Sequence, residues 1–135
     1  MTVFCSITPC DGVIPMGRLQ SADPMVEKRI FDRVNNGKLY MGLNAYRAYG
    51  EPDSVIATPS PLDHCKKGEF CLLSGQDTTP FKDKISRIVV FRWKKNSPST
   101  RFFRLFRESG WIVESEDSFF SKEGIPITET VYIRQ

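Results

Sequence analysis

Basic and aromatic side chains alternate over residues 91–111, in the last third of the chain. The basic residues are Arg92, Lys94, Lys95, Arg101, Arg104 and Arg107, interleaved with Trp93, Phe102, Phe103 and Phe106. Ser97-Pro98 is a typical helix start, because serine caps free N–H groups and proline is tolerated at the first helical position. Gly110 is a typical helix end. We therefore predict a helix over this stretch, on which Arg101, Arg104 and Arg107 form one row.

This predicted basic helix, together with Lys94 and Lys95 in the preceding turn, has two interpretations. A row of positive charge is a suitable binding surface for phosphate groups or for an acidic protein. The ordinary alternative is an amphipathic helix with a solvated arginine face. The functional interpretation predicts a macromolecular partner, either a nucleic acid or a protein.

A carboxylate, Glu27, borders the apolar face of an earlier predicted helix. Asp23-Pro24 begins this helix by the same chemistry of cap and proline. The apolar residues that follow share one face at helical spacing and are Val26, Ile30, Phe31 and Val34. A carboxylate at such an edge can enter a half-buried pocket and have a raised pKa, as general acids often do. A solvated helix carboxylate is the ordinary alternative.

The other reactive side chains predict neither a metal site nor a nucleophile. The imaginable zinc ligands are Cys5, Cys10, His64, Cys65 and Cys71. The gaps between the paired cysteines differ from the tight spacing of zinc knuckles, so we predict no metal. His64 and Cys65 are adjacent, and adjacent side chains usually point apart, which disfavours a cysteine–histidine pair.

Length and composition predict one cytoplasmic domain spanning residues 1–135. A hydrophobic content of 40% is enough for one core, and the net charge of +3 is only a mild bias. No apolar run approaches the roughly 20 residues that a bilayer requires, so we predict no membrane contact. Because the N-terminus has no secretory pattern, we expect the four cysteines to be reduced thiols.

Short strand patterns alternate with the two predicted helices. The predicted strands cover residues 2–8, 38–41, 54–58, 69–73, 84–93, 111–115 and 128–134. Residues 43–49 are predicted as a short helical segment and residues 59–68 as a loop. This order predicts an α/β fold with a mixed, mostly parallel sheet, flanking helices and an antiparallel pair of strands at the C-terminus.

The order of elements, together with short sequence pieces, resembles the dihydrofolate reductase family and its relatives in riboflavin synthesis. Asp11-Gly12-Val13-Ile14 follows the first strand, where the family has a turn and then Val-Ile-Gly. Leu39-Tyr40-Met41-Gly42 matches a strand that ends in Met-Gly. Phe70 to Gly75 stands where an apolar strand runs into a double glycine. The resemblance implies a reduced version of this fold, because several weak marks occur in the right order.

The resemblance also implies site residues. The family carries on its first helix an acid that helps to protonate the pterin ring, and four residues later a Phe that packs on the substrate. Glu27 and Phe31 reproduce that spacing. The positions at which the family holds NADPH phosphates are occupied here by Gly42, Asn44, Ser74 and Gly75.

The cofactor positions depart from the family's pattern. The family has an Arg and a Thr or Ser directly after Met-Gly, whereas this chain has Leu43 to Tyr46. Ser74-Gly75 replaces the double glycine, and Asp77, whose charge opposes phosphate, follows. The family's Trp after the early loop is missing from residues 17–20, and the segment 54–75 is too short for the extra strand and helix that bind the adenosine half.

These departures favour a non-catalytic binding protein on a reduced dihydrofolate reductase-like scaffold, with no cofactor and with the basic helix as its partner-binding surface. The alternative is an NADPH-dependent reductase of folate, pterin or flavin-precursor type, with Glu27 as its proton donor. A small nucleotide- or metabolite-binding domain without redox chemistry is a third hypothesis. The fold alone does not choose among them, because one fold hosts many functions.

Overall fold

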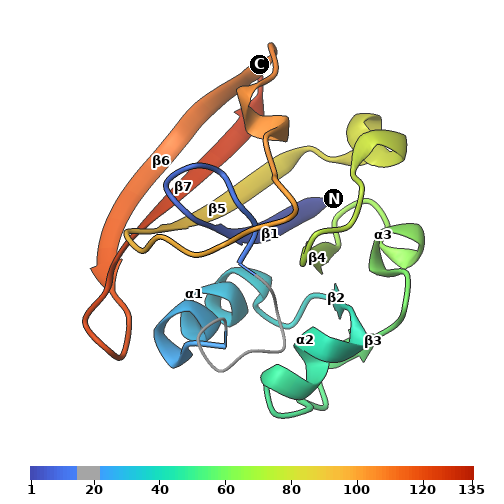
Figure 1. Cartoon of the computed structure of the whole chain (residues 1–135). Helices are drawn as coiled ribbons and strands as arrows, with labels where there is room; N and C mark the ends of the chain where they lie inside the picture. The colour runs from blue at the N-terminus through green and yellow to red at the C-terminus, as the bar shows by residue number, and fades with distance from the viewer. Residues whose placement is uncertain (15–21) are drawn as a thin grey trace.

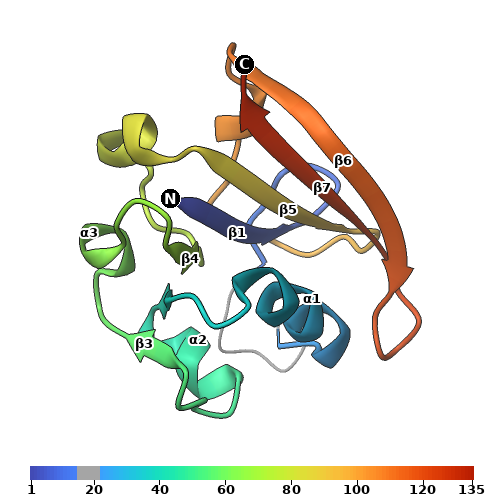
Figure 2. The same cartoon turned by 180° about the vertical axis from the view of Figure 1, so that it is seen from behind.

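A mixed β-sheet is the centre of the protein in the computed structural model, which describes residues 1–14 and 22–135 (Figures 1 and 2). Its strands stand in the order β3-β2-β4-β1-β5-β7-β6. They are β1 (Thr2–Ile7), β2 (Leu39–Met41), β3 (Val55–Ala57), β4 (Phe70–Leu72), β5 (Arg87–Trp93), β6 (Trp111–Phe120) and β7 (Pro126–Arg134).

The first five strands run parallel to one another, and β7 runs opposite to both of its neighbours. β1 pairs in parallel with β4 and β5, and β2 with β3 and β4. β7 runs antiparallel to both β5 and β6. The predicted fold class is therefore confirmed. The C-terminal strands are longer than predicted, and β6 extends to Phe120, which we expected in the connection.

Helices cover both faces of the sheet. α1 (Pro24–Val34) and α2 (Leu43–Ala48) pack on one face, where Val26 and Ala45 join one buried cluster. α3 (Pro61–His64) and the short helix η2 (Thr79–Lys84) pack on the other. α3 lies where we predicted a loop. Among the described residues, no helix is both long enough and apolar enough to cross a bilayer.

α1 begins where the sequence predicts. The Asp23 carboxylate accepts hydrogen bonds from the N–H groups of Met25 and Val26, at 2.9 and 3.3 Å. Its other oxygen accepts from Lys122 N at 2.9 Å, in the β6–β7 turn. The helix ends at Asn35, whose positive φ of 41° is typical of a left-handed cap. One carboxylate thus starts α1 and ties it to the far end of the sheet.

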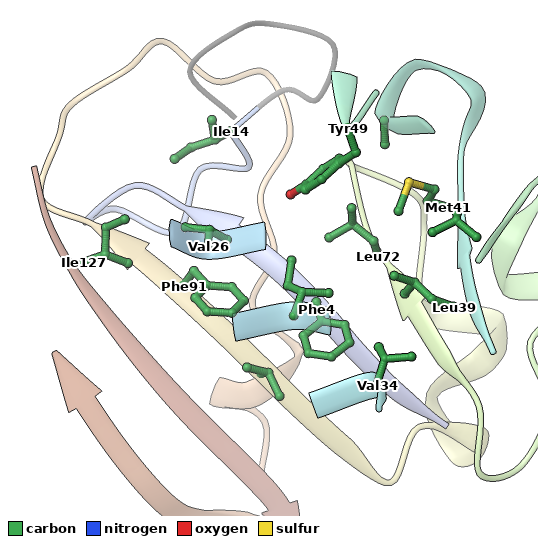
Figure 3. Close-up of a cluster of buried hydrophobic side chains, with 14 of the residues drawn as sticks. Phe4, Ile14, Val26, Val34, Leu39, Met41, Tyr49, Leu72, Phe91 and Ile127 are labelled. Atoms are coloured by element: carbon green, nitrogen blue, oxygen red, sulfur yellow. The ribbon is translucent and has the colours of Figure 1, made fainter. Parts of the chain in front are cut away.

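Aliphatic side chains and a group of aromatic rings form the core between the sheet and α1 (Figure 3). Phe4 of β1 is stacked between Phe70 and Phe91, with ring centroids 5.9 and 6.5 Å apart. Phe91 of β5 also meets Phe119 edge-on at 6.3 Å. Because side chains alternate along a strand, Val3 and Cys5 point into the second core, on the α3 side.

The predicted basic helix after Pro98 is wrong. Residues 94–104 are irregular, and only η3 (Leu105–Arg107), a single 3-10 turn, follows. The backbone of this segment pairs with the loop after β1 instead of with itself. Val13 N donates to Arg101 O at 2.9 Å, and Phe103 N donates to Asp11 O at 3.0 Å. Phe103 and Phe106 then become buried in the second core.

Candidate functional site

The predicted site residues gather near one edge of the sheet. Parallel strands place their carboxyl ends at the same edge, and ligands of open α/β sheets bind there. Gly42 follows β2, Ser74 and Gly75 follow β4 closely, and Lys94 follows β5 directly. The turn that contains Asp11 follows β1 at this edge.

Asp11 holds three arginines by its carboxylate. Arg92 Nη1 lies 2.9 Å from Oδ1, and Arg107 Nε lies 2.6 Å from Oδ2. Arg104 Nε lies 3.4 Å from Oδ2. Desolvation would raise the pKa of Asp11, whose exposed fraction is 4%, but hydrogen bonds and charges from Arg107 and Arg92 outweigh it, so the pKa is lowered. We name these three arginines the arginine cluster.

The arginine cluster carries more positive charge than Asp11 balances. One carboxylate faces three guanidinium groups and is their ion-pair partner in the described part of the chain, so the four side chains together carry a net charge of +2. The side chains of Arg104 and Arg107 are more than half exposed. Arg92 and Arg107 lie against the Phe106 ring, which supports them on an apolar surface. The cluster is thus a fixed, water-accessible patch of excess positive charge.

The sequence pattern predicts Arg104 and Arg107 as candidates, but it indicates Asp11 only as a turn residue. The Asp11 backbone has a φ of 68°, a conformation that aspartate tolerates better than most residues. An Asp-Gly pair is an ordinary turn signal, and nothing local links it to cations that lie 81 to 96 residues further along the chain. The ion pair between Asp11 and Arg92, and its place in the arginine cluster, is therefore visible only in the structure.

Arg101 lies apart from the cluster, across Gly75. Its Nη1 donates to Gly75 O at 3.1 Å. Gly75 has a φ of 106°, and a Cβ at this position would stand 2.7 Å from Arg101 Cδ. The Arg101 side chain therefore fills the space that the glycine leaves open. Gln76 bonds back to Ser74, accepting from Ser74 N at 2.6 Å.

A cavity of about 340 Å³ opens between residues 73–82 and residues 101–108. Buried Cys5, Val13 and Leu73 line its inner part. Arg101 and Phe102 line it from the irregular segment. We name this cavity the Phe102 pocket.

Glu27 lies half-buried on α1, and desolvation raises its pKa. Tyr49, buried at the end of α2, has a pKa raised first by burial and then by the charges of Glu27 and Asp23. In Figure 3 its hydroxyl points toward the side of the core that holds Ile14 and Val26. Glu27 is therefore a carboxylate near a buried phenol, which fits the predicted half-buried setting.

The other sequence predictions have mixed outcomes. Cys5, Cys65 and Cys71 are buried thiols with pKa values raised by burial, to about 12 for Cys5 and about 11 for Cys65. Within residues 1–14 and 22–135, no group of three potential ligands could hold a metal ion. The missing family Trp was inferred from residues 17–20, which lie outside the described residues.

The fold is similar to that of a known enzyme. No protein-family model matches the sequence, and a search of curated proteins finds no match. Among solved structures, dihydrofolate reductase from Enterococcus faecalis, complexed with NADP(H) and RAB-propyl, has a TM-score of 0.70 and 12% identity. The match covers 99% of this chain and 95% of that chain. The chain therefore has a dihydrofolate reductase-like fold, as the resemblance implied.

The residues at the cofactor positions do not fit a dinucleotide. α2 begins at Leu43, and neither Leu43 nor Asn44 brings a positive charge to its start. At Gly75, where the backbone would have to approach a pyrophosphate, Arg101 already occupies the space. Asp77 follows, and the segment 58–69 contains α3 but no strand, although all its residues are described.

Proposed function

We propose that this protein is a non-catalytic, nucleic-acid-binding protein on a dihydrofolate reductase-like scaffold. The arginine cluster carries the proposal. Guanidinium groups bind phosphate through two parallel hydrogen bonds, and here Asp11 fixes three of them while leaving two charges uncompensated. The predicted partner-binding residues Lys94 and Lys95 follow Arg92 at the same end of β5.

An exposed aromatic ring favours a nucleic acid over an acidic protein. Phe102 is 52% exposed, and the Arg104 guanidinium lies 4.6 Å from the centre of its ring. Cations along a backbone path, interleaved with aromatic platforms for bases, are the usual arrangement in proteins that bind nucleic-acid strands. An acidic protein partner would form ion pairs with the arginines and would not need the exposed ring of Phe102. In this proposal Arg104 and Arg107 act from a segment fixed by Asp11 rather than from a helix.

Binding of labelled oligonucleotides at several salt concentrations tests this proposal. Because phosphate contacts release counterions, we expect the affinity to fall steeply with salt. R104A and K94A should each weaken binding to all sequences and reduce the slope of log affinity against log salt by about one. Fluorescence anisotropy measures both quantities.

K28A is the matched control, because Lys28 is an exposed lysine on α1, paired with Asp32 at 2.9 Å, away from the arginine cluster. It should leave both the affinity and the slope unchanged. Absence of binding at low salt would contradict the proposal, as would equal effects of K28A and R104A. Binding of a polyglutamate peptide, with none for oligonucleotides, would instead indicate an acidic protein partner.

The reductase alternative is favoured by one observation, the raised pKa of half-buried Glu27. The proposal predicts no saturable NADPH binding up to millimolar concentration, because Arg101 fills the space at Gly75. Nicotinamide fluorescence and melting temperature, measured together during an NADPH titration, check this. Micromolar binding with a rise in melting temperature would support the reductase, and E27Q should then abolish its activity.

A further inference from the structure

We infer that the Phe102 pocket accepts one unpaired base of a nucleic-acid strand, so that the protein selects single strands over duplexes. The inference rests on the proposed function and specifies its partner. It concerns a cavity on the face of the sheet opposite α1 and Glu27. The phosphates flanking that base would contact Arg101 on one side of the pocket and the arginine cluster on the other.

The floor of the pocket is apolar, whereas polar and charged side chains provide most of its exposed lining. Buried Cys5, Val13 and Leu73 form this floor, and Phe103 of the irregular segment and Leu105 of η3 lie beside them. The Cys5 thiol is neutral at physiological pH, because burial raises its pKa to about 12. A cavity of about 340 Å³ lies near the lower end of the usual range for ligand sites, about 300–1,000 Å³. This size suits one nucleoside rather than a base pair.

Phe102 provides a stacking surface at the mouth of the pocket. Its neighbour Phe103 is buried, whereas half of Phe102 is exposed to water. The backbone of residue 102 forms an antiparallel bridge with Gly12, so the ring stands on a fixed support. Base–aromatic stacking tolerates any sequence, since every base has a flat π-face. An exposed ring that is held in place beside a cavity with an apolar floor is therefore suited to an inserted base.

Polar groups surround the mouth of the pocket and can contact the base edge and the phosphates. Gln76, Thr78 and Thr79 offer donors and acceptors, as base edges require. Arg101 donates to the Gly75 carbonyl, and a guanidinium has five N–H groups in total, so donors remain for a phosphate.

Two carboxylates also border the pocket, and both already have partners within the protein. Glu108 pairs with Lys82 at 3.0 Å. Asp77 accepts a hydrogen bond from Thr79 N at 3.0 Å. Lys82 balances Glu108, and Arg101 and Arg104, which also line the pocket, outweigh the remaining negative charge of Asp77.

A base can enter this pocket only if it is not paired. In a duplex the faces of each base are covered by its neighbours and its edge is used by its partner, so insertion would require unstacking and unpairing. A single strand presents its bases without most of that cost. The pocket thus gives a preference for single strands over duplexes. The arginine cluster alone would not give this preference, because both single strands and duplexes carry phosphates.

The test compares F102A with the unchanged protein in binding to oligo-dT, to oligo-U and to a DNA duplex of equal length, at one salt concentration. Loss of one stacked base should weaken single-strand binding about 10–100-fold. Duplex binding should change much less than single-strand binding, because Arg104 loses the ring on which it packs but keeps its contact with Asp11. The salt slope should stay nearly the same, because no charge is removed. F102W should restore single-strand binding, and its fluorescence should be quenched when a base stacks. Comparison of oligo-dT with oligo-U shows which strand type is preferred.

F120A is the control, because Phe120 is a comparably exposed ring at the end of β6. Unchanged single-strand binding by F102A, with R104A still weakening it, would overturn this inference and leave the proposed function intact. Duplex binding as tight as single-strand binding would also overturn it. Absence of any nucleic-acid binding by the unchanged protein would overturn both.

Discussion

Replacement of Asp11 by Asn is expected to lower the free energy of unfolding by about 2–3 kcal/mol at neutral pH. The substitution keeps the size of the side chain and tolerates the positive φ, but it removes the charge that three arginines share. Removal of one partner from a buried ion pair costs about 3–5 kcal/mol. We expect the lower figure because Arg104 and Arg107 can turn toward water. Urea unfolding followed by circular dichroism measures the difference.

The effect of D11N should depend on pH. The pKa of Asp11 is lower in the folded protein than its ordinary value of about 3.9. A lowered pKa means that the carboxylate stabilises the fold above the unfolded-state pKa, and that this contribution is lost as the pH falls through the folded-state pKa. The stability difference between the two proteins should therefore be constant near neutral pH and shrink below about pH 4.

D32N is the matched control, since Asp32 forms an exposed ion pair with Lys28 within α1. Exposed pairs of this kind contribute about 0.3–0.5 kcal/mol. If D11N destabilised the protein no more than D32N, or if its effect grew as the pH fell below 4, the ion-pair account of Asp11 would be contradicted.

Replacement of Phe91 by Ala is expected to cost more, about 3–5 kcal/mol of the free energy of unfolding. Phe91 is fully buried on β5, between β1 and β7, where it stacks on Phe4 and meets Phe119 edge-on. Its truncation would leave a cavity between β5 and α1, and the dense core could not fill this space. Because whole domains are stable by only about 5–15 kcal/mol, F91A should be close to unfolding at physiological temperature. Thermal and urea denaturation measure this loss.

Two substitutions calibrate that result. F91L keeps an apolar side chain that fills much of the volume and should cost clearly less than F91A. F120A removes a ring that is 63% exposed and should change stability by no more than about 0.5 kcal/mol. If F91A and F120A lowered the free energy of unfolding equally, burial of the Phe91 ring would not stabilise the fold.

Local chemistry in the sequence was enough to predict many of the elements. Asp23 and Pro24 specify the start of α1 through contacts that span three residues. The β-branched and aromatic run from Ile88 to Phe91 has the composition typical of a strand and lies in β5. The order of these elements then predicted the mixed sheet and its resemblance to dihydrofolate reductase. The start of α1 and the strand β5 were confirmed because local residues decide them, whereas the short helix α3 was missed.

The tertiary structure alone decided the conformation of residues 98–107 and the candidate site that they form. Ser97-Pro98 is a valid helix start, yet residues 101–103 form backbone hydrogen bonds with residues 11–13, some 90 positions earlier. Asp11 then brings Arg92, Arg104 and Arg107 to one carboxylate. Helix propensity differs by less than about 1 kcal/mol per residue for ordinary residues, so long-range pairing and burial of Phe103 and Phe106 outweigh it.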